Sequence, residues 1–319
     1  MMFNWMEKRV LVTGGGGFLG SHVVEQLKAK NCKEIVVIRK RDYDLTTESE
    51  VKRMYDEHPV DVVIHLAGYV GGIGANDALP GDFFYQNLMM NTLTIEYARR
   101  AGVEKVVAAG AGCGYPEHAP LPLKESDFWN GYPQEASAPY SLAKRMLHTQ
   151  SIAYWKQYKF PILILVPGNI YGPHDNYDLE AAHVIPALVR KFVEATDDQK
   201  PSLEVWGSGA PTRDFVYAGD VAAGMIAAAE QLDTPVFMNM ARGEETSIRA
   251  VVEALVNVTG YRGEIVWNTS RPEGQSRRVF DMSLAKSKLG FSASTTVIDG
   301  LKKTVDWYRE NRLSARNVV

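Results

Sequence analysis

Continuous apolar runs alternate with amphipathic helical patterns through the first half of this chain of 319 residues. The runs predict strands at 9–13, 34–38, 60–67, 105–109 and 161–166, and the patterns predict helices at 19–30, 48–57, 83–101 and 139–158. Apolar strands separated by helices are typical of a parallel sheet that is covered on both faces. We therefore predict an α/β fold with a doubly wound parallel sheet.

The second half of the sequence is less regular. Helical patterns cover 182–196, 220–231, 248–259, 284–289 and 298–312, strands are expected at 236–240 and 264–266, and 205–215 is expected to be a loop rich in turn-forming residues. This mixture indicates a smaller mixed α/β domain built on the first. We assign residues 1–172 to the first domain, with 214–241 returning to it, and 173–213 with 242–319 to the second.

Composition excludes several classes of function. The 35 Lys and Arg against 38 Asp and Glu leave a formal net charge of −3, which provides no electrostatic footprint for nucleic acid. No apolar run approaches the ~20 residues that cross a bilayer, and the first ten residues lack the apolar stretch of a signal peptide. Cys32 and Cys113 are too few for a disulfide framework or a zinc site. We expect a cytoplasmic protein that binds no membrane, nucleic acid or metal.

A glycine-rich turn, TGGGGFLG, joins the first predicted strand to the first predicted helix. Gly14, Gly17 and Gly20 are spaced Gly-x-x-Gly-x-x-Gly. Glycine permits unusual backbone angles, lets a pyrophosphate approach bare amides and lets the helix pack closely on its strand. The positive end of the helix dipole favours phosphate. The turn therefore predicts a Rossmann dinucleotide-binding site rather than a purely structural turn, and its spacing resembles the extended short-chain dehydrogenase/reductase superfamily.

Basic residues at the end of the second predicted strand distinguish between the two nicotinamide cofactors. NAD enzymes usually place a carboxylate there for the ribose hydroxyls, whereas a 2′-phosphate favours arginine. Here the strand ends Ile38-Arg39-Lys40-Arg41. The alternative is a solvated basic turn. We favour NADP(H), held by Arg39 and Arg41.

Tyr140 and Lys144 stand four residues apart and so share one face of a predicted helix. A phenol has a pKa of about 10 and is a poor acid or base at neutral pH. A neighbouring ammonium and a nicotinamide cation would lower the pKa of Tyr140 toward the working range. Chance supplies such pairs, so the prediction depends on the position of this one downstream of a nucleotide-binding turn.

Further motifs carry a resemblance to a known family. They are GGIGAN (71–76), DFFYQNLM (82–89), CGYP (113–116), WNGYP (129–133), APY (138–140), NIYGP (169–173), HVIPAL (183–188), VWGSG (205–209) and RDF (213–215). Together they resemble the GDP-L-fucose synthase family, NADPH-dependent 3,5-epimerases and 4-reductases of GDP-4-keto-6-deoxymannose. The resemblance is dense from about residue 9 to 230 and looser beyond. It implies the family's fold, a homodimer and a nucleotide-sugar substrate.

By this resemblance, Tyr140 and Lys144 are catalytic, and Cys113 and His183 move protons at the sugar carbons that flank the ketone. The chemistry of these residues agrees. A ketone at carbon 4 acidifies the hydrogens on carbons 3 and 5, and a thiol and an imidazole both titrate near neutral pH. Taken singly, Cys113 fits a small buried apolar residue, and His183 fits a hydrogen-bonding residue at a helix start.

Ligand contacts are expected from two further sets of residues. For the cofactor they are Phe18, Leu19, Leu66, Ala67, Pro167, Asn169, Ile170 and His183, in addition to the glycines, arginines, Tyr140 and Lys144. For the substrate they are Asn169, Arg190, Lys191, Trp206, Arg213 and Arg278. Guanidinium forks suit a diphosphate, and an indole suits a base or sugar face. The alternative for each arginine is plain surface charge.

One position departs from the family pattern. The family carries Ser or Thr four residues before the tyrosine of its Tyr-Pro pair, hydrogen-bonded to the substrate carbonyl oxygen. Counting back from Tyr115 gives Ala111, and no residue from 109 to 114 has a hydroxyl. Losing one charge-assisted donor costs ~1.5–3 kcal/mol, roughly ten- to over a hundredfold in rate. A water molecule or Ser141 is the alternative donor.

The predicted function is an NADPH-dependent sugar-nucleotide epimerase/reductase acting on a nucleotide-linked 4-keto-6-deoxyhexose. Two alternatives remain open. One is an epimerase without net reduction on another keto-sugar nucleotide, and the other is a non-catalytic homologue that binds NADP(H) or a sugar nucleotide. Ala111 favours these alternatives, whereas the presence of Tyr140, Lys144, Cys113 and His183 favours the enzyme.

Overall fold

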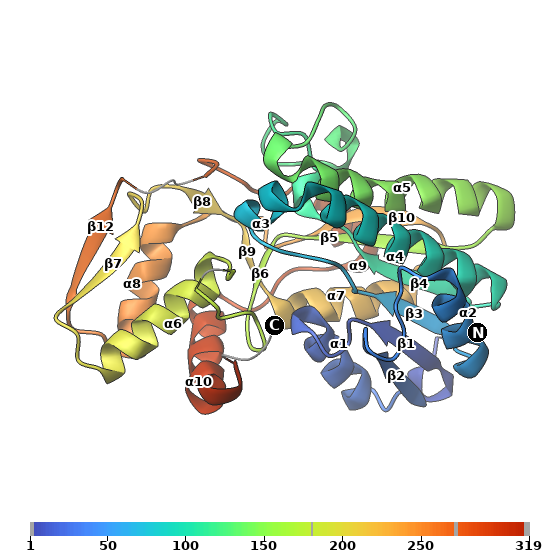
Figure 1. Ribbon diagram of the computed structural model, residues 1–319, viewed down its shortest axis with the longest axis horizontal. Helices are drawn as coiled ribbons and strands as arrows, with labels where there is room; N and C mark the ends of the chain where they lie inside the picture. The colour runs from blue at the N-terminus through green and yellow to red at the C-terminus, as the bar shows by residue number, and fades with distance from the viewer. Residues whose placement is uncertain (1–2, 180, 271–273, 316–319) are drawn as a thin grey trace.

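The computed structural model of the chain describes residues 3–179, 181–270 and 274–315. Six strands form its central sheet: β1 Arg9–Thr13, β2 Glu34–Ile38, β3 Val62–His65, β4 Lys105–Ala109, β5 Ile162–Pro167 and β10 Val236–Met240. They lie in the order β2-β1-β3-β4-β5-β10, and every neighbouring pair is parallel (Figure 1). The predicted doubly wound α/β sheet is confirmed.

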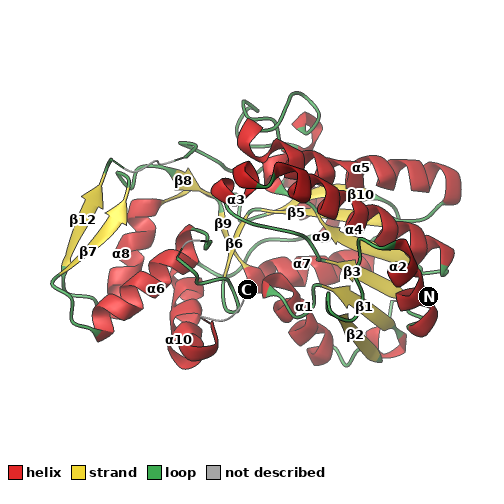
Figure 2. Cartoon of the chain, viewed as in Figure 1, coloured by secondary structure: helices red, strands yellow, loops and turns green. Residues whose placement is uncertain are grey.

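Helices cover both faces of this sheet (Figure 2). One face carries α1 Phe18–Ala29, α7 Ala218–Gln231 and α9 Ser283–Leu289, and the other carries α2 Glu48–Glu57, α4 Pro80–Arg100 and α5 Ala138–Tyr158. Successive side chains of a strand point to opposite faces. Val10 and Val12 therefore pack in the hydrophobic cluster with α1 and α7, while Leu11 packs in the cluster with α2 and α4. Burial on both faces explains why inner strands such as β3 and β5 are almost entirely apolar.

A second hydrophobic cluster lies away from the sheet. It is formed by α6 Val184–Asp197, α8 Ile248–Thr259, α10 Val297–Ala315 and a parallel pair of strands, β7 Ser202–Trp206 and β12 Glu264–Asn268. These elements fall in the segments assigned to a second domain. Helix α9 falls there too, but its Ala285 packs in the cluster of the sheet with α7.

The sequence predictions of short elements were incomplete. The strand predicted at 60–67 is β3, Val62–His65, and the loop predicted at 205–215 contains part of β7, β8 Thr212–Arg213 and the start of β9 Phe215–Tyr217. The sequence also missed α3 Ile73–Ala78, β6 Asn169–Tyr171, β11 Thr246–Ser247 and the short 3-10 helices Trp5–Glu7, Gly112–Gly114, Glu125–Asp127 and Glu135–Ser137. The missed strands pair β6 with β9 and β8 with β11. Their formation depends on partners distant in sequence, which local periodicity does not report.

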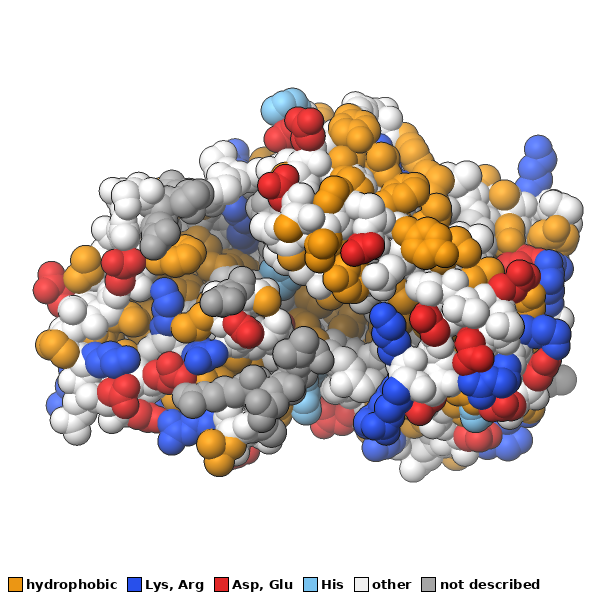
Figure 3. All heavy atoms as spheres, viewed as in Figure 1, with side chains coloured by type: hydrophobic (Ala, Val, Ile, Leu, Met, Phe, Trp, Pro, Cys, Tyr) orange, Lys and Arg blue, Asp and Glu red, His pale blue; other side chains and the backbone are white. Residues whose placement is uncertain are grey.

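The space-filling view is hollowed between the half that holds the sheet and the half that holds α6, α8 and α10 (Figure 3). In open parallel sheets, ligands bind at the carboxyl ends of the strands, where the strand order reverses. Here β1 is followed in the chain by its neighbour β2 on one side and then by β3 on the other. Among the described residues, no helix is both long and apolar enough to cross a membrane.

Candidate active site

The glycine-rich turn lies at the carboxyl end of β1 and has no room for side chains. Gly14 has a φ of +68°, and a Cβ there would lie 2.9 Å from the backbone nitrogen of Ala67. A Cβ on Gly20 would lie 2.1 Å from the Gly14 carbonyl oxygen, and one on Gly17 3.2 Å from that oxygen. The glycines therefore let α1 start directly against β1 and bring Leu66 and Ala67, which follow β3, beside the turn.

Helix α1 presents its N-terminus to this turn. Gly17 is its N-cap, and among the described residues no side chain caps it and no acidic residue stands in its first turn. Phe18 and Leu19 begin the helix. Free amides at a helix N-terminus form an anion site. The turn therefore fits the pyrophosphate of a dinucleotide.

Arg39, Lys40 and Arg41 follow β2 at the same edge of the sheet. Ile38, the last residue of β2, is in register with Thr13, which precedes Gly14. All three basic side chains are exposed. Arg41 lies 3.6 Å from the Asp42 carboxylate, and both groups are largely in water, so the pair holds Arg41 only weakly.

Tyr140 and Lys144 project from α5 toward the carboxyl ends of β3 and β4. Nζ of Lys144 donates to the Ala109 carbonyl oxygen over 3.4 Å, and a Cβ on Gly68 would lie 3.6 Å from it. The Tyr140 ring packs edge-to-face against Phe83, with centroids 6.3 Å apart. The spacing predicted a shared helix face, and the structure places both side chains at the carboxyl edge of the sheet.

Burial alters the protonation of both groups. Burial lowers the pKa of Lys144 to about 8, and the nearby charge of Cys113 opposes that lowering. Burial and the charge of Cys113 both raise the pKa of Tyr140. The lowering predicted for Tyr140 from Lys144 is therefore not seen in the protein alone, because desolvation of the phenolate dominates. Tyr140 is accordingly protonated at neutral pH and suited to donate a proton.

Cys113 lies in the 3-10 helix Gly112–Gly114, at the carboxyl end of β4, as a half-buried free thiol. Cys113 itself interacts electrostatically with Tyr140, Lys144 and Arg278. The structure therefore brings Cys113 together with Tyr140 and Lys144. Pro167 is close by, since a Cβ on Gly112 would lie 3.4 Å from the Pro167 carbonyl oxygen.

His183 is the N-cap of α6, at the end of the loop that follows β6. His183 is exposed as a whole residue. The protein around its imidazole ring nevertheless removes water from the ring, and this desolvation lowers the pKa of His183. A neutral imidazole can accept or donate a proton at neutral pH. Among the described residues, no hydrogen bond joins His183 to Cys113, Tyr140 or Lys144, so the proximity of these groups stays a prediction.

The strand β6 extends the site from β5. Asn169 donates its backbone N–H to the Asp214 carbonyl oxygen over 2.9 Å, and Ile170 pairs with Val216 of β9. Both residues are half-buried. Asn169 follows Pro167, the last residue of β5, by two residues. It therefore lies at the same carboxyl edge of the sheet as the glycine-rich turn.

Two of the predicted phosphate-binding residues lie close together. Arg213, on β8, has its pKa lowered by burial and by the neighbouring charge of Arg278. Asp214, which follows Arg213 in the chain, is a fully buried carboxylate that accepts backbone N–H bonds from Arg242, Gly243 and Phe280. Asp214 thus fastens the chain segments that carry the two arginines. Two guanidinium groups in mutual repulsion are stabilised by a diphosphate.

The other predicted substrate residues lie on the second cluster. Nε of Arg190 pairs with Glu194 at 3.1 Å, and its Nη1 donates to the Tyr177 carbonyl oxygen at 3.0 Å, so its guanidinium is engaged within its own unit. Nζ of Lys191 lies 5.2 Å from the ring centroid of Trp206, which is half-exposed.

Ala111 lies immediately before Cys113's turn and is 8% exposed. The Ser141 hydroxyl, considered as a substitute, is buried and has no hydrogen-bond partner among the described residues. Its oxygen has essentially no accessible surface, so a bound substrate could not contact it in this conformation. In this structure, therefore, Ser141 does not replace the hydroxyl that is missing at Ala111.

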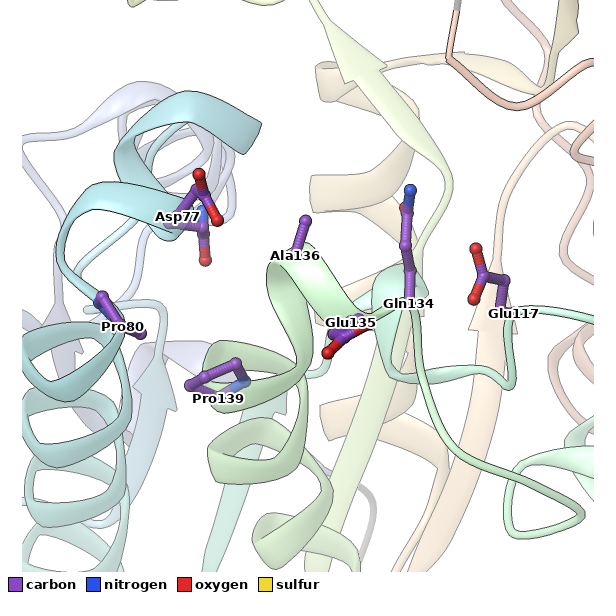
Figure 4. A pocket seen from close by; sticks show the side chains of 8 residues that line it. Asp77, Pro80, Glu117, Gln134, Glu135, Ala136 and Pro139 are labelled. Carbon is purple, nitrogen blue, oxygen red and sulfur yellow. The ribbon is translucent and has the colours of Figure 1, made fainter.

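A separate pocket lies beside α3 and the start of α5 (Figure 4). Its lining includes Asp77, Glu117 and Glu135, with Pro139 next to Tyr140. Within the described ranges, no group of three His, Cys, Asp or Glu side chains is arranged to hold a metal ion. The pocket is acidic and therefore unsuited to phosphate.

A family profile described as "NAD dependent epimerase/dehydratase family" matches residues 10–241, from β1 to the end of β10. The chain belongs to this family. It is 36% identical to the GDP-L-fucose synthase of Sinorhizobium fredii over 304 residues, 95% of this chain and 96% of that protein. The resemblance to GDP-L-fucose synthases that the motifs predicted is confirmed.

Solved structures agree with this membership. A GDP-L-fucose synthetase from Naegleria fowleri bound to NADP superposes with a TM-score of 0.88 at 27% identity, covering 99% of this chain and 96% of that one. A GDP-D-glycero-L-gluco-heptose synthase from Campylobacter jejuni, in the presence of NADPH, gives 0.88 at 27% identity, with 95% and 99% coverage.

Sequence reasoning missed two groups of this site. Asp214 was noted only as part of the motif RDF, because the segment 205–215 was expected to be a loop, where a carboxylate is usually exposed to solvent. Arg145, which directly follows Lys144, is buried at 3% exposure and holds the turn that contains Cys113. Helical spacing alone places Arg145 beside Lys144 without showing what it contacts.

Proposed function

We propose that this family member is an NADPH-dependent sugar-nucleotide epimerase/reductase that acts on a GDP-linked 4-keto-6-deoxyhexose. The observation that carries the proposal is the grouping of Tyr140, Lys144 and Cys113 at the carboxyl edge of the sheet, next to the uncapped N-terminus of α1. A dinucleotide site and three proton-transfer groups in one place fit a reaction that combines proton and hydride transfer.

The cofactor site fits a dinucleotide because Gly14, Gly17 and Gly20 lack side chains at positions where a Cβ would come too close to backbone atoms. Bound NADPH supplies a hydride for carbon 4 of the sugar. Tyr140 then protonates the carbonyl oxygen, and the Lys144 ammonium orients the cofactor and stabilises negative charge on the phenol. Leu66, Ala67, Pro167 and Ile170 provide the walls of this site.

Epimerisation at carbons 3 and 5 requires removal of a proton from one face of the ring and delivery to the other. Cys113 and His183 perform these transfers, because a thiol and an imidazole can each accept and donate a proton. Arg213 and Arg278 bind the diphosphate, and Trp206 and Lys191 contact the distal part of the nucleotide. The segments 173–213 and 242–319 thus serve as the substrate-binding domain.

NADPH should bind at least tenfold more tightly than NADH, because Arg39 and Arg41 offer positive charge to the 2′-phosphate. Fluorescence titration of the parent with both cofactors measures this. The double change Arg39→Ala, Arg41→Ala should remove most of the preference without weakening NADH, while Lys52→Ala, on the exposed pair with Asp56, should change neither affinity. Equal affinities in the parent, or a preference for NADH, would exclude the assignment of NADP(H).

The same proposal includes a homodimer that pairs α4 and α5 of two subunits. Hydrophobic side chains gather on the surface over these helices (Figure 3). The exposed large hydrophobic residues of these helices include Tyr85, 57% exposed on α4, and Ile152, 55% exposed on α5, with Leu79 and Phe84 at and near the start of α4. Exposed apolar patches of this kind are typical of subunit interfaces.

Ile152→Glu should convert the dimer to a monomer, because a carboxylate placed in the interface between the subunits would lose its hydration. Sedimentation velocity of the parent and the variant measures the state. Ile298→Glu is the matched control, since Ile298 is equally exposed, at 61%, on α10. A parent that sediments as a monomer at micromolar concentration contradicts the dimer.

We further propose a cytoplasmic location, where the NADPH pool and a reducing environment suit the two free thiols, Cys32 and Cys113. Absorbance at 340 nm tests the function itself. NADPH should be oxidised with GDP-4-keto-6-deoxymannose, and at least tenfold more slowly with the same sugar on UDP. Oxidation with neither compound would reject the substrate class.

A further inference from the structure

The carbonyl groups on both sides of Cys113 are each held by a guanidinium group. Nε of Arg145, on α5, donates to the Gly114 carbonyl oxygen over 2.6 Å. Nη2 of Arg278 donates to the carbonyl oxygen of Gly112. The short helix that carries Cys113 is therefore fixed from two sides by elements distant in sequence.

Arg145 is itself held rigidly. Its Nη1 donates to the Gly131 carbonyl oxygen over 2.9 Å, and its guanidinium lies 5.2 Å from the ring centroid of Phe128 and 5.3 Å from that of Trp129. A planar guanidinium group that donates to two carbonyl oxygens and packs on two aromatic rings is restricted to one orientation. Arg145 thereby connects the Cys113 turn to the loop around 128–131.

Among the described residues, no carboxylate forms an ion pair with the cations around Cys113. In the described part of the chain, Lys144, Arg145 and Arg278 donate their hydrogen bonds to carbonyl or amide oxygens. Nη2 of Arg145 is buried without any partner among the described residues. These three cations and Tyr140 interact electrostatically with Cys113. The other titratable groups that interact with the cations include Tyr132 at Arg145, Tyr115 at Arg278 and His65 at Lys144. The thiolate of Cys113 is thus the group best placed to neutralise the cluster.

We propose that Arg145 is a positioning residue, which together with Arg278 fixes the turn around Cys113 and stabilises the thiolate used in proton transfer. This inference rests on the proposed function for the role of Cys113. The effect of Arg145 on thiolate formation at Cys113 can be measured without any substrate.

The test uses the full chain with Cys32→Ser, so that Cys113 is the only thiol. Alkylation by iodoacetamide, followed by mass spectrometry as a function of pH, gives the midpoint of thiolate formation, since only the thiolate reacts. Arg145→Met should raise this midpoint by about one pH unit or more, because an opposite charge nearby is removed. Arg99→Met is the control. Arg99 lies in the last turn of α4 and forms an ion pair with Glu96. Removing its charge should leave the midpoint of thiolate formation unchanged.

Arg145→Lys separates position from charge. It should keep the midpoint near that of the parent, but it should slow deuterium exchange into the substrate at least tenfold with little change in KM, because an ammonium does not fork between two carbonyls. An unchanged midpoint in Arg145→Met, or parental exchange in Arg145→Lys, overturns the proposal. If Arg145→Met does not melt cooperatively, Arg145→Gln, which is also neutral, gives the same comparison. A shifted midpoint with no exchange by the parent on any keto-sugar refutes the proposed function and retains the thiolate site.

Discussion

Tyr140→Phe should lower the rate of NADPH oxidation about 10²- to 10⁴-fold, the contribution of a positioned general acid. The substitution removes the proton that neutralises the developing alkoxide at carbon 4. It leaves the ring that packs edge-to-face on Phe83, so the affinity for NADPH should change by less than threefold. Steady-state oxidation at 340 nm and a fluorescence titration of NADPH measure the two quantities on one preparation.

Tyr132→Phe is the control for Tyr140→Phe, because Tyr132 is 62% exposed and loses a hydroxyl without a role at the reacting carbon. Its oxidation rate should equal that of the parent. Deuterium exchange in Tyr140→Phe should continue, since Cys113 and His183 are intact. A variant that retains more than a tenth of the parental rate would show that another group donates the proton.

Ala111→Ser should raise turnover about tenfold to a hundredfold, the value of one hydrogen bond to a charged oxygen. The hydroxyl would stabilise charge that develops in the transition state, so the gain should appear in kcat rather than in KM. Gly110 and Gly112 are packed against Val166 and Phe280, but the change adds only one oxygen to an existing Cβ. Initial rates across a range of substrate concentrations separate the two parameters.

Ser141→Ala is the matched comparison for Ala111→Ser. The Ser141 hydroxyl is buried without a partner, so its removal should leave the parental rate within about twofold. A tenfold loss would show that Ser141 supplies the donor. If Ala111→Ser leaves NADPH oxidation at zero while the parent exchanges deuterium rapidly, the epimerase without reduction replaces the proposed function.

The fold could be predicted where strands are apolar runs bounded by turns. The strands β1, β2 and β4 begin and end at the predicted residues, because apolar periodicity bounded by turns is a local property. The short strand β8 was missed because its two residues pair with Thr246 and Ser247, far along the chain. Similarly, β7 shows an alternating burial pattern that only pairing with β12 stabilises.

The site could be predicted where a motif fixes both residue type and place. The glycine turn and the Tyr140–Lys144 pair lie together at one edge because the carboxyl ends of parallel strands meet there. The pKa of Tyr140 could not be predicted, because burial outweighs the charge of its sequence neighbour Lys144. The role of Arg145 also depends on tertiary contacts, since Gly114 and Gly131 reach it from loops.

The central claim is that one site both exchanges protons and reduces the ketone. Incubating the protein with GDP-4-keto-6-deoxymannose in heavy water, with and without NADPH, tests it most directly by magnetic resonance of the sugar. Without NADPH, deuterium should enter carbons 3 and 5 of the unreduced sugar, and Cys113→Ser or His183→Asn should slow this entry. With NADPH, the product should be reduced at carbon 4 and carry deuterium at both neighbouring carbons. Reduction without deuterium at carbons 3 and 5, or exchange that both variants leave untouched, would contradict the account.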